Sequence, residues 1–230
     1  MSGGGVESVT HQRLVLAAPG EAAGLAAFLG RQLRWDRAAA ARLRAEGDVL
    51  AVFTRPARFG VLAIRPCHLR EPAGLDVTVS AGELLEGVDE AAGALGVPAP
   101  VTGPSWAGLL PRRGGWLPVA DLTPEEARGA AASVVAEFRT RTEALIPAQR
   151  TRSALDALAE EIWSRTLPGT PLPLRVVHAA HALGLLAEVP PAGVTVLSGG
   201  SWLRLRTPAG SIAVRRDGPP GLAGLGVTPV

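Results

Sequence analysis

The alternation of apolar and polar residues is clearest over residues 194–216, where it predicts three short strands joined by two tight turns. The first turn is centred on Gly199 and Gly200, because two glycines can supply the positive φ angles that a two-residue hairpin loop needs. The second turn covers residues 207–210, with Pro208 preset for its second position. This stretch therefore predicts a three-stranded antiparallel meander.

The two turns also set a register, which divides the side chains between two faces. It places Leu197 opposite Trp202 in the first hairpin and Leu205 opposite Ile212 in the second. One face is apolar and consists of Val194, Val196, Leu203, Leu205, Ile212 and Val214. The other face carries the candidate binding surface, which consists of Trp202, Arg204, Arg206 and Arg215. Tryptophan and arginine are favoured as interface anchors. The alternative is that the indole packs under the proline-rich tail while the guanidinium groups are solvated.

Three amphipathic segments precede the meander and predict a helical unit that covers its apolar face. They span residues 123–146, 151–167 and 174–186. The first begins with Thr123, Pro124 and Glu126, which is the pattern of a capping box with proline in the first turn. The third is apolar nearly all round, so we expect it to be central.

The first hundred residues predict a smaller α+β unit. We expect strands at residues 12–18, 48–54, 59–65 and 75–79, and helices at 20–33, 36–46 and 80–87. The helix at 36–46 is inferred from its alanines and from Asp36 as an N-cap.

The predicted fold class is α+β. We expect an N-terminal small sheet with covering helices in residues 1–95, a connector rich in proline, glycine and tryptophan at 96–122, a three-helix unit followed by the meander at 123–217, and a flexible tail at 218–230.

Composition excludes several classes of protein. Hydrophobic residues make up 47% of the chain, which is enough for a core and excludes global disorder. Lysine is absent, so a Walker-type phosphate site and a Schiff-base enzyme are excluded. No apolar run is long enough to span a membrane, the first residues lack the order of a signal peptide, and a single cysteine permits no internal disulfide. We therefore expect a cytoplasmic protein with no membrane partner.

The distribution of arginines leaves nucleic acid open as a partner. The formal net charge is only +2, which by itself favours neither a protein nor a nucleic acid. Arg34, Trp35 and Arg37 form a possible secondary basic surface beside the predicted helix at 36–46. Such a helix could lie along a phosphate backbone, or it could be an ordinary amphipathic helix with arginines at the surface.

Few residues are candidates for chemistry. His178 and His181 share one face of the third helix, and with Cys67 and His68 they could supply four metal ligands. Their spacing is not a zinc pattern, and Cys67 and His68 are neighbours on a strand, so their side chains should point to opposite faces. No GxSxG, HExxH or GxGxxG motif after a strand occurs. We expect no metal, no cofactor and no catalytic residue.

Three segments carry a resemblance to known sequences: PLRVVHAAHALGLL, VTVLSGGSWLRLRTPAGSIAVRR and GLAAFLGRQLRWDRAAAARL. Together they resemble uncharacterised proteins of high-GC actinobacteria over most of the chain. The resemblance implies no activity and no functional residue.

The predicted function is that of a cytoplasmic, non-catalytic binding or regulatory protein that acts through a protein partner, using the candidate binding surface. One alternative is a nucleic-acid-binding protein with a winged-helix-like C-terminal unit, an idea that depends only on the order of the elements. The predicted helix at 174–186 offers Arg175 and two histidines for base readout, which is little. The other alternative is an enzyme without a recognisable local motif, using His178 or His181.

Overall fold

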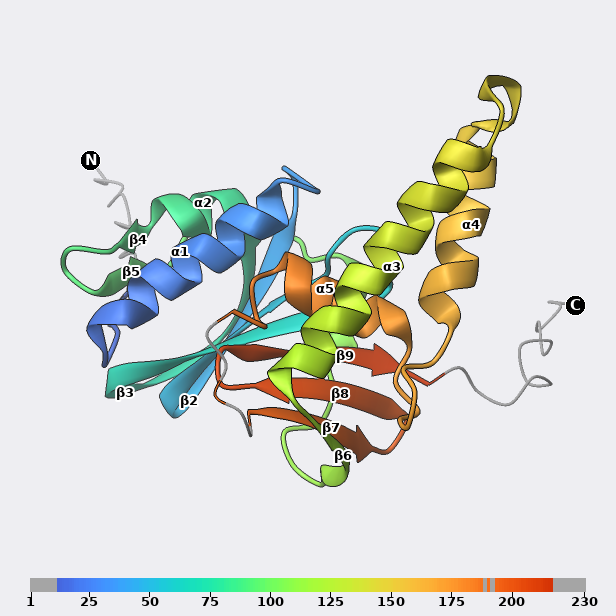
Figure 1. Ribbon diagram of the computed structural model, residues 1–230. Helices are drawn as coiled ribbons and strands as arrows, with labels where there is room; N and C mark the ends of the chain where they lie inside the picture. Colours follow the sequence, from blue (N-terminus) through green and yellow to red (C-terminus); the bar gives the residue numbers. More distant parts are fainter. Residues whose placement is uncertain (1–11, 188–189, 191–192, 217–230) are drawn as a thin grey trace, which may run out of the picture. The chain divides into compact units, whose positions relative to one another are not determined.

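The computed structural model describes residues 12–187, 190 and 193–216 (Figure 1). The chain divides into two compact units. Unit 1 comprises residues 1–54 and 65–108, and unit 2 comprises residues 55–64 and 109–230. In the described residues the elements are mixed α and β, with two antiparallel sheets, which confirms the predicted α+β class. The division at residues 108 and 109 falls inside the segment that was predicted to be a connector. The predicted tail at 218–230 lies outside the described residues.

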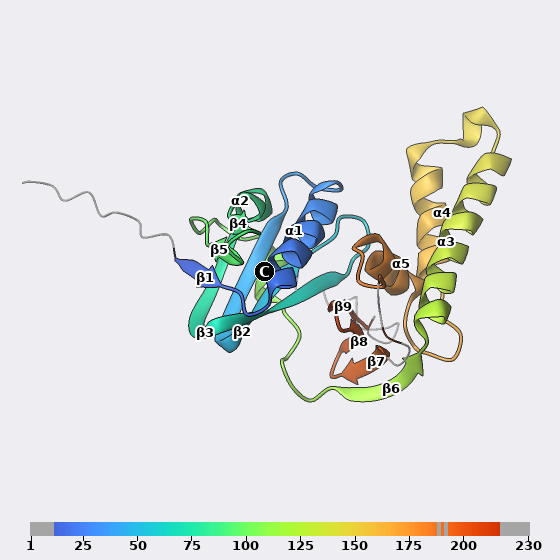
Figure 2. The same ribbon diagram turned by 60° about the vertical axis from the view of Figure 1, so that its left-hand side comes forward.

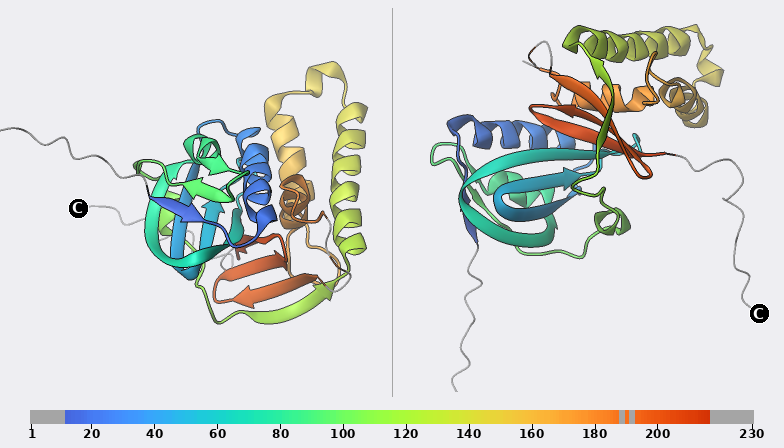
Figure 3. Two further views of the ribbon diagram at one scale, coloured as in Figure 1. Left: turned by 90° about the vertical axis from the view of Figure 1, so that its left-hand side faces the viewer. Right: turned by 90° about the horizontal axis from the view of Figure 1, so that it is seen from below.

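Unit 1 combines a small sheet, a long strand pair and two helices. The small sheet has the order β1 (Arg13–Val15), β5 (Ala94–Gly96), β4 (Val88–Asp89). The long pair is β2 (Ala40–Thr54) beside β3 (Leu62–Ser80), and α1 (Pro19–Leu33) lies across these two strands (Figure 3). Helix α1 buries Leu25, Phe28 and Leu29, so it is the covering helix that was expected over this sheet.

The predicted helix at 36–46 is wrong. Asp36 caps a turn, because its carboxylate accepts a hydrogen bond from the amide of Ala38 at 3.0 Å, and strand β2 begins at Ala40. Along β2, Ala41, Leu43 and Ala45 are buried in strict alternation with more exposed polar residues. This period of two is visible in the sequence, but the alanines of the segment also have a high helix propensity.

Helix α2 (Ala81–Glu86) has the predicted start. The Ser80 hydroxyl accepts a hydrogen bond from the amide of Glu83. The helix ends at Gly87, whose amide donates to the carbonyl of Glu83 at 2.9 Å. A Cβ atom at Gly87 would lie 2.5 Å from the carbonyl oxygen of Gly96, so only glycine lets α2 approach β5 this closely.

Unit 2 contains three helices and an antiparallel sheet. The helices are α3 (Pro124–Ala144), α4 (Arg152–Ser164) and α5 (Leu174–Ala182). The strands are β6 (Leu117–Leu122), β7 (Val194–Gly199), β8 (Trp202–Thr207) and β9 (Gly210–Arg215), in the order β9-β8-β7-β6. Residues Leu62–Ile64 of β3 pair with the other edge of β9, so β3 begins in unit 2 and continues in unit 1.

The three helices form as expected, but each ends two to four residues earlier than predicted. The capping box of α3 is present, with the Thr123 amide donating to the Glu126 carboxylate at 2.7 Å. Helices α3 and α4 form an antiparallel hairpin (Figure 2). Helix α5 stops at Ala182 instead of residue 186, because Gly184 adopts a φ of 77° and turns the chain back.

The predicted meander is confirmed, and its second hairpin has the predicted register, with Leu205 opposite Ile212. The first hairpin is displaced by two residues, so Arg204, and not Trp202, lies opposite Leu197. Only Gly200 takes a positive φ, at 56°, and Gly199 stays in the strand. A shift of two keeps every side chain on its predicted face. The apolar face is buried and contacts α5 through β8 and β9.

Strand β6 was not predicted as a strand. Its sequence, LPVADL, contains a proline, and its pairing with β7 is irregular between Pro118 and Ala120. Two short 3₁₀ turns, at Ser105–Gly108 and Pro147–Gln149, complete the described elements. Within the described residues, no helix has the length and apolar character that crossing a membrane requires.

Candidate protein-binding surface of unit 2

Three rows of paired residues bring the predicted surface together. Trp202 pairs with Arg215, Arg204 pairs with Ala213, and Arg206 pairs with Ser211. Directly paired residues in an antiparallel sheet point to the same side, and alternate rows return to that side. Trp202, Arg204, Arg206 and Arg215 therefore share the face of the sheet that is opposite to α5.

Trp116, just before β6, joins this face and was missed from the sequence. Its ring centroid lies 5.4 Å from the guanidinium carbon of Arg204. The indole N–H donates to the carbonyl of Arg112 at 2.9 Å, and the ring packs over Gly199. Pairing of β6 with β7 brings Trp116 here, and no local pattern in the sequence signals that pairing.

Arg204 is the most enclosed arginine of this group. Its Nε donates to the Ser211 hydroxyl at 2.8 Å while Trp116 covers its guanidinium. Burial, and to a smaller extent Arg206, lower the pKa of the Arg204 guanidinium, which still carries its charge at neutral pH. Its position is thus set by contacts within unit 2.

Arg215 and Arg206 form the accessible part of the face. The guanidinium carbon of Arg215 lies 5.9 Å from the ring centroid of half-buried Trp202, and both Arg215 and Arg206 are exposed. We call the five residues Trp116, Trp202, Arg204, Arg206 and Arg215 the arginine–tryptophan layer. It holds aromatic and cationic groups in fixed positions at the surface of a rigid sheet.

Strand β6 borders this layer and adds apolar surface. It is the last strand of the order, and Leu117 and Val119 are 68% and 46% exposed. Exposed edge strands can pair with other chains. Pro118, which has no N–H, and the irregularity beside it are features that commonly limit such pairing.

The possible secondary basic surface belongs to unit 1. Arg34 and Trp35 lie in the turn that follows α1, with Trp35 37% exposed, and Arg37 follows them and is also exposed. No helix follows them, so the arrangement that would track a phosphate backbone is absent. The arginines of β2 instead make ion pairs with Asp76, at 2.7 Å from Arg42 and 3.6 Å from Arg44.

The histidines of α5 are in different surroundings. His178 packs edge-on against Phe59 and Trp163, with ring centroids 5.1 Å and 5.4 Å away, whereas His181 is exposed. Burial, and to a smaller extent His181, lower the pKa of His178. In the described part of the chain no three histidine, cysteine, aspartate or glutamate side chains are grouped to hold a metal ion.

Cys67 and His68 differ in burial, but both lie beside Glu21. The Cys67 thiol is fully buried, and burial, followed by the nearby Glu21 carboxylate, raises its pKa to about 12. A thiol in this state is a poor nucleophile at neutral pH. Exposed His68 instead meets Glu21, with Nδ1 and the carboxylate oxygen 3.0 Å apart.

Two family models match the chain. Residues 9–108 match a domain of unknown function (DUF8010), and residues 111–219 match a second domain of unknown function (DUF8185). No curated protein matches the sequence.

Sliding clamps are similar to the chain at low identity. The beta sliding clamp of C. crescentus is 14% identical with a TM-score of 0.48, and the match covers 90% of this chain and 65% of that chain. The DNA polymerase sliding clamp of Pseudomonas aeruginosa is 12% identical with a TM-score of 0.46, covering 90% of this chain and 66% of that chain. The chain thus spans just under two thirds of these proteins, and likeness at this level carries no argument about function.

Proposed function

We propose that this chain is a non-catalytic binding protein whose partner is a protein, and that the partner docks on the arginine–tryptophan layer. The observation that carries the proposal is the pair of arginine–tryptophan contacts on one sheet face, Trp116 with Arg204 and Trp202 with Arg215. Preformed contacts of this kind lower the entropy cost of binding, because the large side chains are already ordered.

The chemistry of the layer favours a partner with acidic and apolar groups. Arg206 and Arg215 expose cations. On the same face, the β6–β7 pairing places the acidic residue Asp121 opposite Thr195. At the adjacent edge, β6 exposes Leu117 and Val119, and Leu117 points to the other side of the sheet because it pairs with Ser198 in the row of Leu203. A partner that presents carboxylates to the layer and aliphatic groups to this edge complements both features.

A nucleic acid is a poorer match for the same face. Binding to phosphates needs several free cations, and each contact adds to a steep salt dependence. Arg204 is engaged by Ser211 and Trp116, and Arg215 lies over Trp202. The helix that would enter a groove, α5, buries Val176, Val177, Ala179 and Ala180, so it is not available for base contacts.

The test is quantitative co-purification with the tagged full chain from extracts of the organism that encodes it. We expect a reproducible protein partner whose recovery falls at least about tenfold with Arg206→Glu and with Trp202→Ala. Arg139→Glu makes the same charge change at an exposed position of α3 and should leave recovery unchanged. Circular dichroism should first show that each variant is folded.

Three outcomes would contradict the proposal. One is that the wild-type chain recovers no protein above an empty resin. Another is that both layer variants recover the same proteins as the wild type. The third is that nuclease treatment removes everything that was captured, which would assign the layer to nucleic acid.

A further inference from the structure

A second feature of unit 2, separate from the arginine–tryptophan layer, is a groove of about 400 Å³ beside α3. Its apolar lining comes from Leu122 before α3, Val134 on α3, and Leu167 and Leu174 in the segment that leads from α4 into α5. The groove is open along α3 because that helix contributes the small residues Ala130 and Ser133 there. Val134 and Leu167 form the largely buried floor of the groove, and Leu122 and Leu174 are more accessible at its sides.

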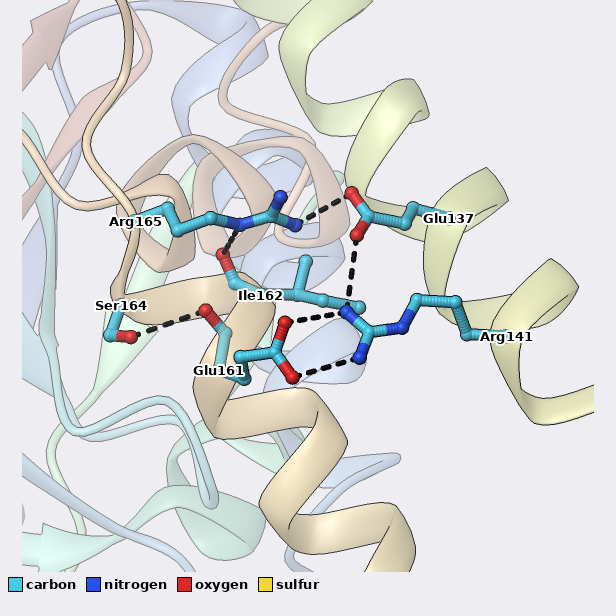
Figure 4. A network of polar contacts seen from close by, with 6 residues as sticks. All are labelled: Glu137, Arg141, Glu161, Ile162, Ser164 and Arg165. Carbon is cyan, nitrogen blue, oxygen red and sulfur yellow. Dashed lines mark hydrogen bonds and ion pairs between the residues drawn. The ribbon is translucent and has the colours of Figure 1, made fainter. Parts of the chain in front are cut away.

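The charged residues beside the groove already have partners within the chain. Glu126 accepts hydrogen bonds from the Thr123 amide and hydroxyl at 2.7 and 3.0 Å. Glu137 pairs with Arg165 at 2.6 Å and with Arg141 at 3.4 Å. Figure 4 shows Glu137 between these two arginines. The pKa values of both carboxyls are held below the usual range by these hydrogen bonds.

A groove with an apolar lining and internally paired charges fits an uncharged aliphatic segment. A basic peptide would have to break the ion pairs of Glu137, and an acidic peptide would meet two ionised carboxylates. The sequence contains such an uncharged segment, residues 218–230 (GPPGLAGLGVTPV), which follows the last described residue closely and lies outside the described part of the chain.

When extended, this segment is longer than α3. Thirteen residues can span up to about 45 Å when extended. Helix α3, with its 21 residues, is about 31 Å long. Strand β9, from which the segment continues, contacts α5 in the same unit. We propose that residues 218–230 dock in the groove beside α3 of their own chain, with the leucine and valine side chains of the segment against Val134, Leu167 and Leu174.

The proposal can be tested in the full chain by trapping with engineered thiols. Ser133→Cys places a thiol in the groove, and Leu222→Cys places one in the segment. The native Cys67 is fully buried with a raised pKa, so it should not interfere. We expect an intramolecular disulfide to form under mild oxidation, measured by mass spectrometry and by gel mobility without reductant.

The matched control pairs Leu222→Cys with Val135→Cys, an exposed position on the far side of α3 from Ser133. The groove pair should form its disulfide at least about tenfold faster than the control pair, because docking raises the effective concentration of the two thiols. Adding Ala130→Arg, which fills the groove, should remove this difference. Equal rates for the two pairs would overturn the proposal, and so would a disulfide found only between two copies of the chain.

Discussion

Arg204 and Arg206 lie two residues apart on the same face of β8, yet their surroundings are different. Arg204 is half-buried, donates to Ser211 and lies against Trp116, whereas Arg206 is exposed. Ser211 is almost fully buried, so it depends on Arg204 for the hydrogen bond of its hydroxyl. Arg204 therefore has a structural role in the sheet, whereas Arg206 is the arginine proposed to contact a partner.

We expect Arg204→Met to lower the free energy of unfolding by about 1–3 kcal/mol, because it removes a charge-assisted hydrogen bond and a cation–π contact. The matched variant Arg206→Met should change it by no more than about 0.5 kcal/mol. Urea unfolding followed by tryptophan fluorescence measures both. Equal effects of the two variants would contradict the assignment of Arg204 to the structure of the sheet.

His178 should make the stability of unit 2 depend on pH. Its pKa lies below the ordinary value of 6.5, so the folded state favours the neutral ring. As the pH falls from about 7 to about 5, the unfolded chain binds a proton more readily than the folded chain, and stability is lost. The urea midpoint of the wild type should therefore fall more steeply over this range than that of His178→Gln. His181→Gln, at an exposed position, should retain most of the change of the urea midpoint with pH.

At the scale of the element, part of the fold was predictable from the sequence. In the second hairpin, only one loop length around Pro208 and Gly210 keeps Arg204 and Arg206 off the apolar face. The register of this hairpin could therefore be predicted. The first hairpin was predicted one residue too early, because Gly199 and Gly200 were both placed in the loop, whereas the loop is Gly200 and Ser201. Gly199 stays in the strand beneath Trp116, which is remote in sequence.

The candidate site was predictable only in part for the same reason. Residues on β8 and β9 follow from local alternation, whereas Trp116 and the exposed edge of β6 depend on a pairing between segments about 80 residues apart in the chain. The misassigned helix at 36–46 has another cause. Its Ala41, Leu43 and Ala45 alternate as in a strand, but small alanines make the alternation weak in hydrophobicity.

Gly82 in α2 and Gly87 at its C-terminal cap allow a direct test of close packing in unit 1. Gly87→Ala should destabilise the chain by about 1–3 kcal/mol, because the new Cβ would lie 2.5 Å from the backbone oxygen of Gly96. Gly82→Ala, inside the same helix with its nearest atom 3.6 Å away, should be neutral or stabilising by up to about 1 kcal/mol. Thermal unfolding gives both values. A harmless Gly87→Ala would show that α2 can move away from β5.

Polar contacts help to join the two helices of the α3–α4 hairpin. Arg141 makes two hydrogen bonds to Glu161, at 2.6 and 2.8 Å, across the two helices (Figure 4). We expect Glu161→Gln to speed amide hydrogen exchange at residues 139–151 while the exchange of β7–β9 stays unchanged. Asp156→Asn, on the same helix and paired only within α4, is the control. Exchange mass spectrometry would show whether the hairpin end opens separately.

At the scale of the whole molecule, the two units are interleaved in sequence. Residues 55–64 belong to unit 2 although they lie between segments of unit 1. They supply Phe59, which packs against Trp163 with ring centroids 5.1 Å apart, and they supply Leu62–Ile64, which pair with β9. A fragment that starts at residue 109 would lack all of these contacts.

We expect the fragment 109–230 to be less stable than unit 2 in the full chain by at least about 3 kcal/mol, the usual cost of removing a buried aromatic side chain. Fusing residues 55–64 to this fragment through a flexible linker should recover much of the loss. The comparison is made by urea unfolding of the two fragments and the full chain. A fragment 109–230 that unfolds at the same urea concentration as the full chain would contradict the interleaving.

Interleaving also bears on how such a chain can be rearranged during evolution. A recombination point between residues 108 and 109 would deliver the second matched region to a new host without the ten residues that complete its fold. The transferred region would lack the strand residues Leu62–Ile64 that pair with β9 and the Phe59 ring that packs against Trp163. Selection should therefore keep the two regions adjacent in one gene, since the second region would not carry a complete hydrophobic core without residues 55–64.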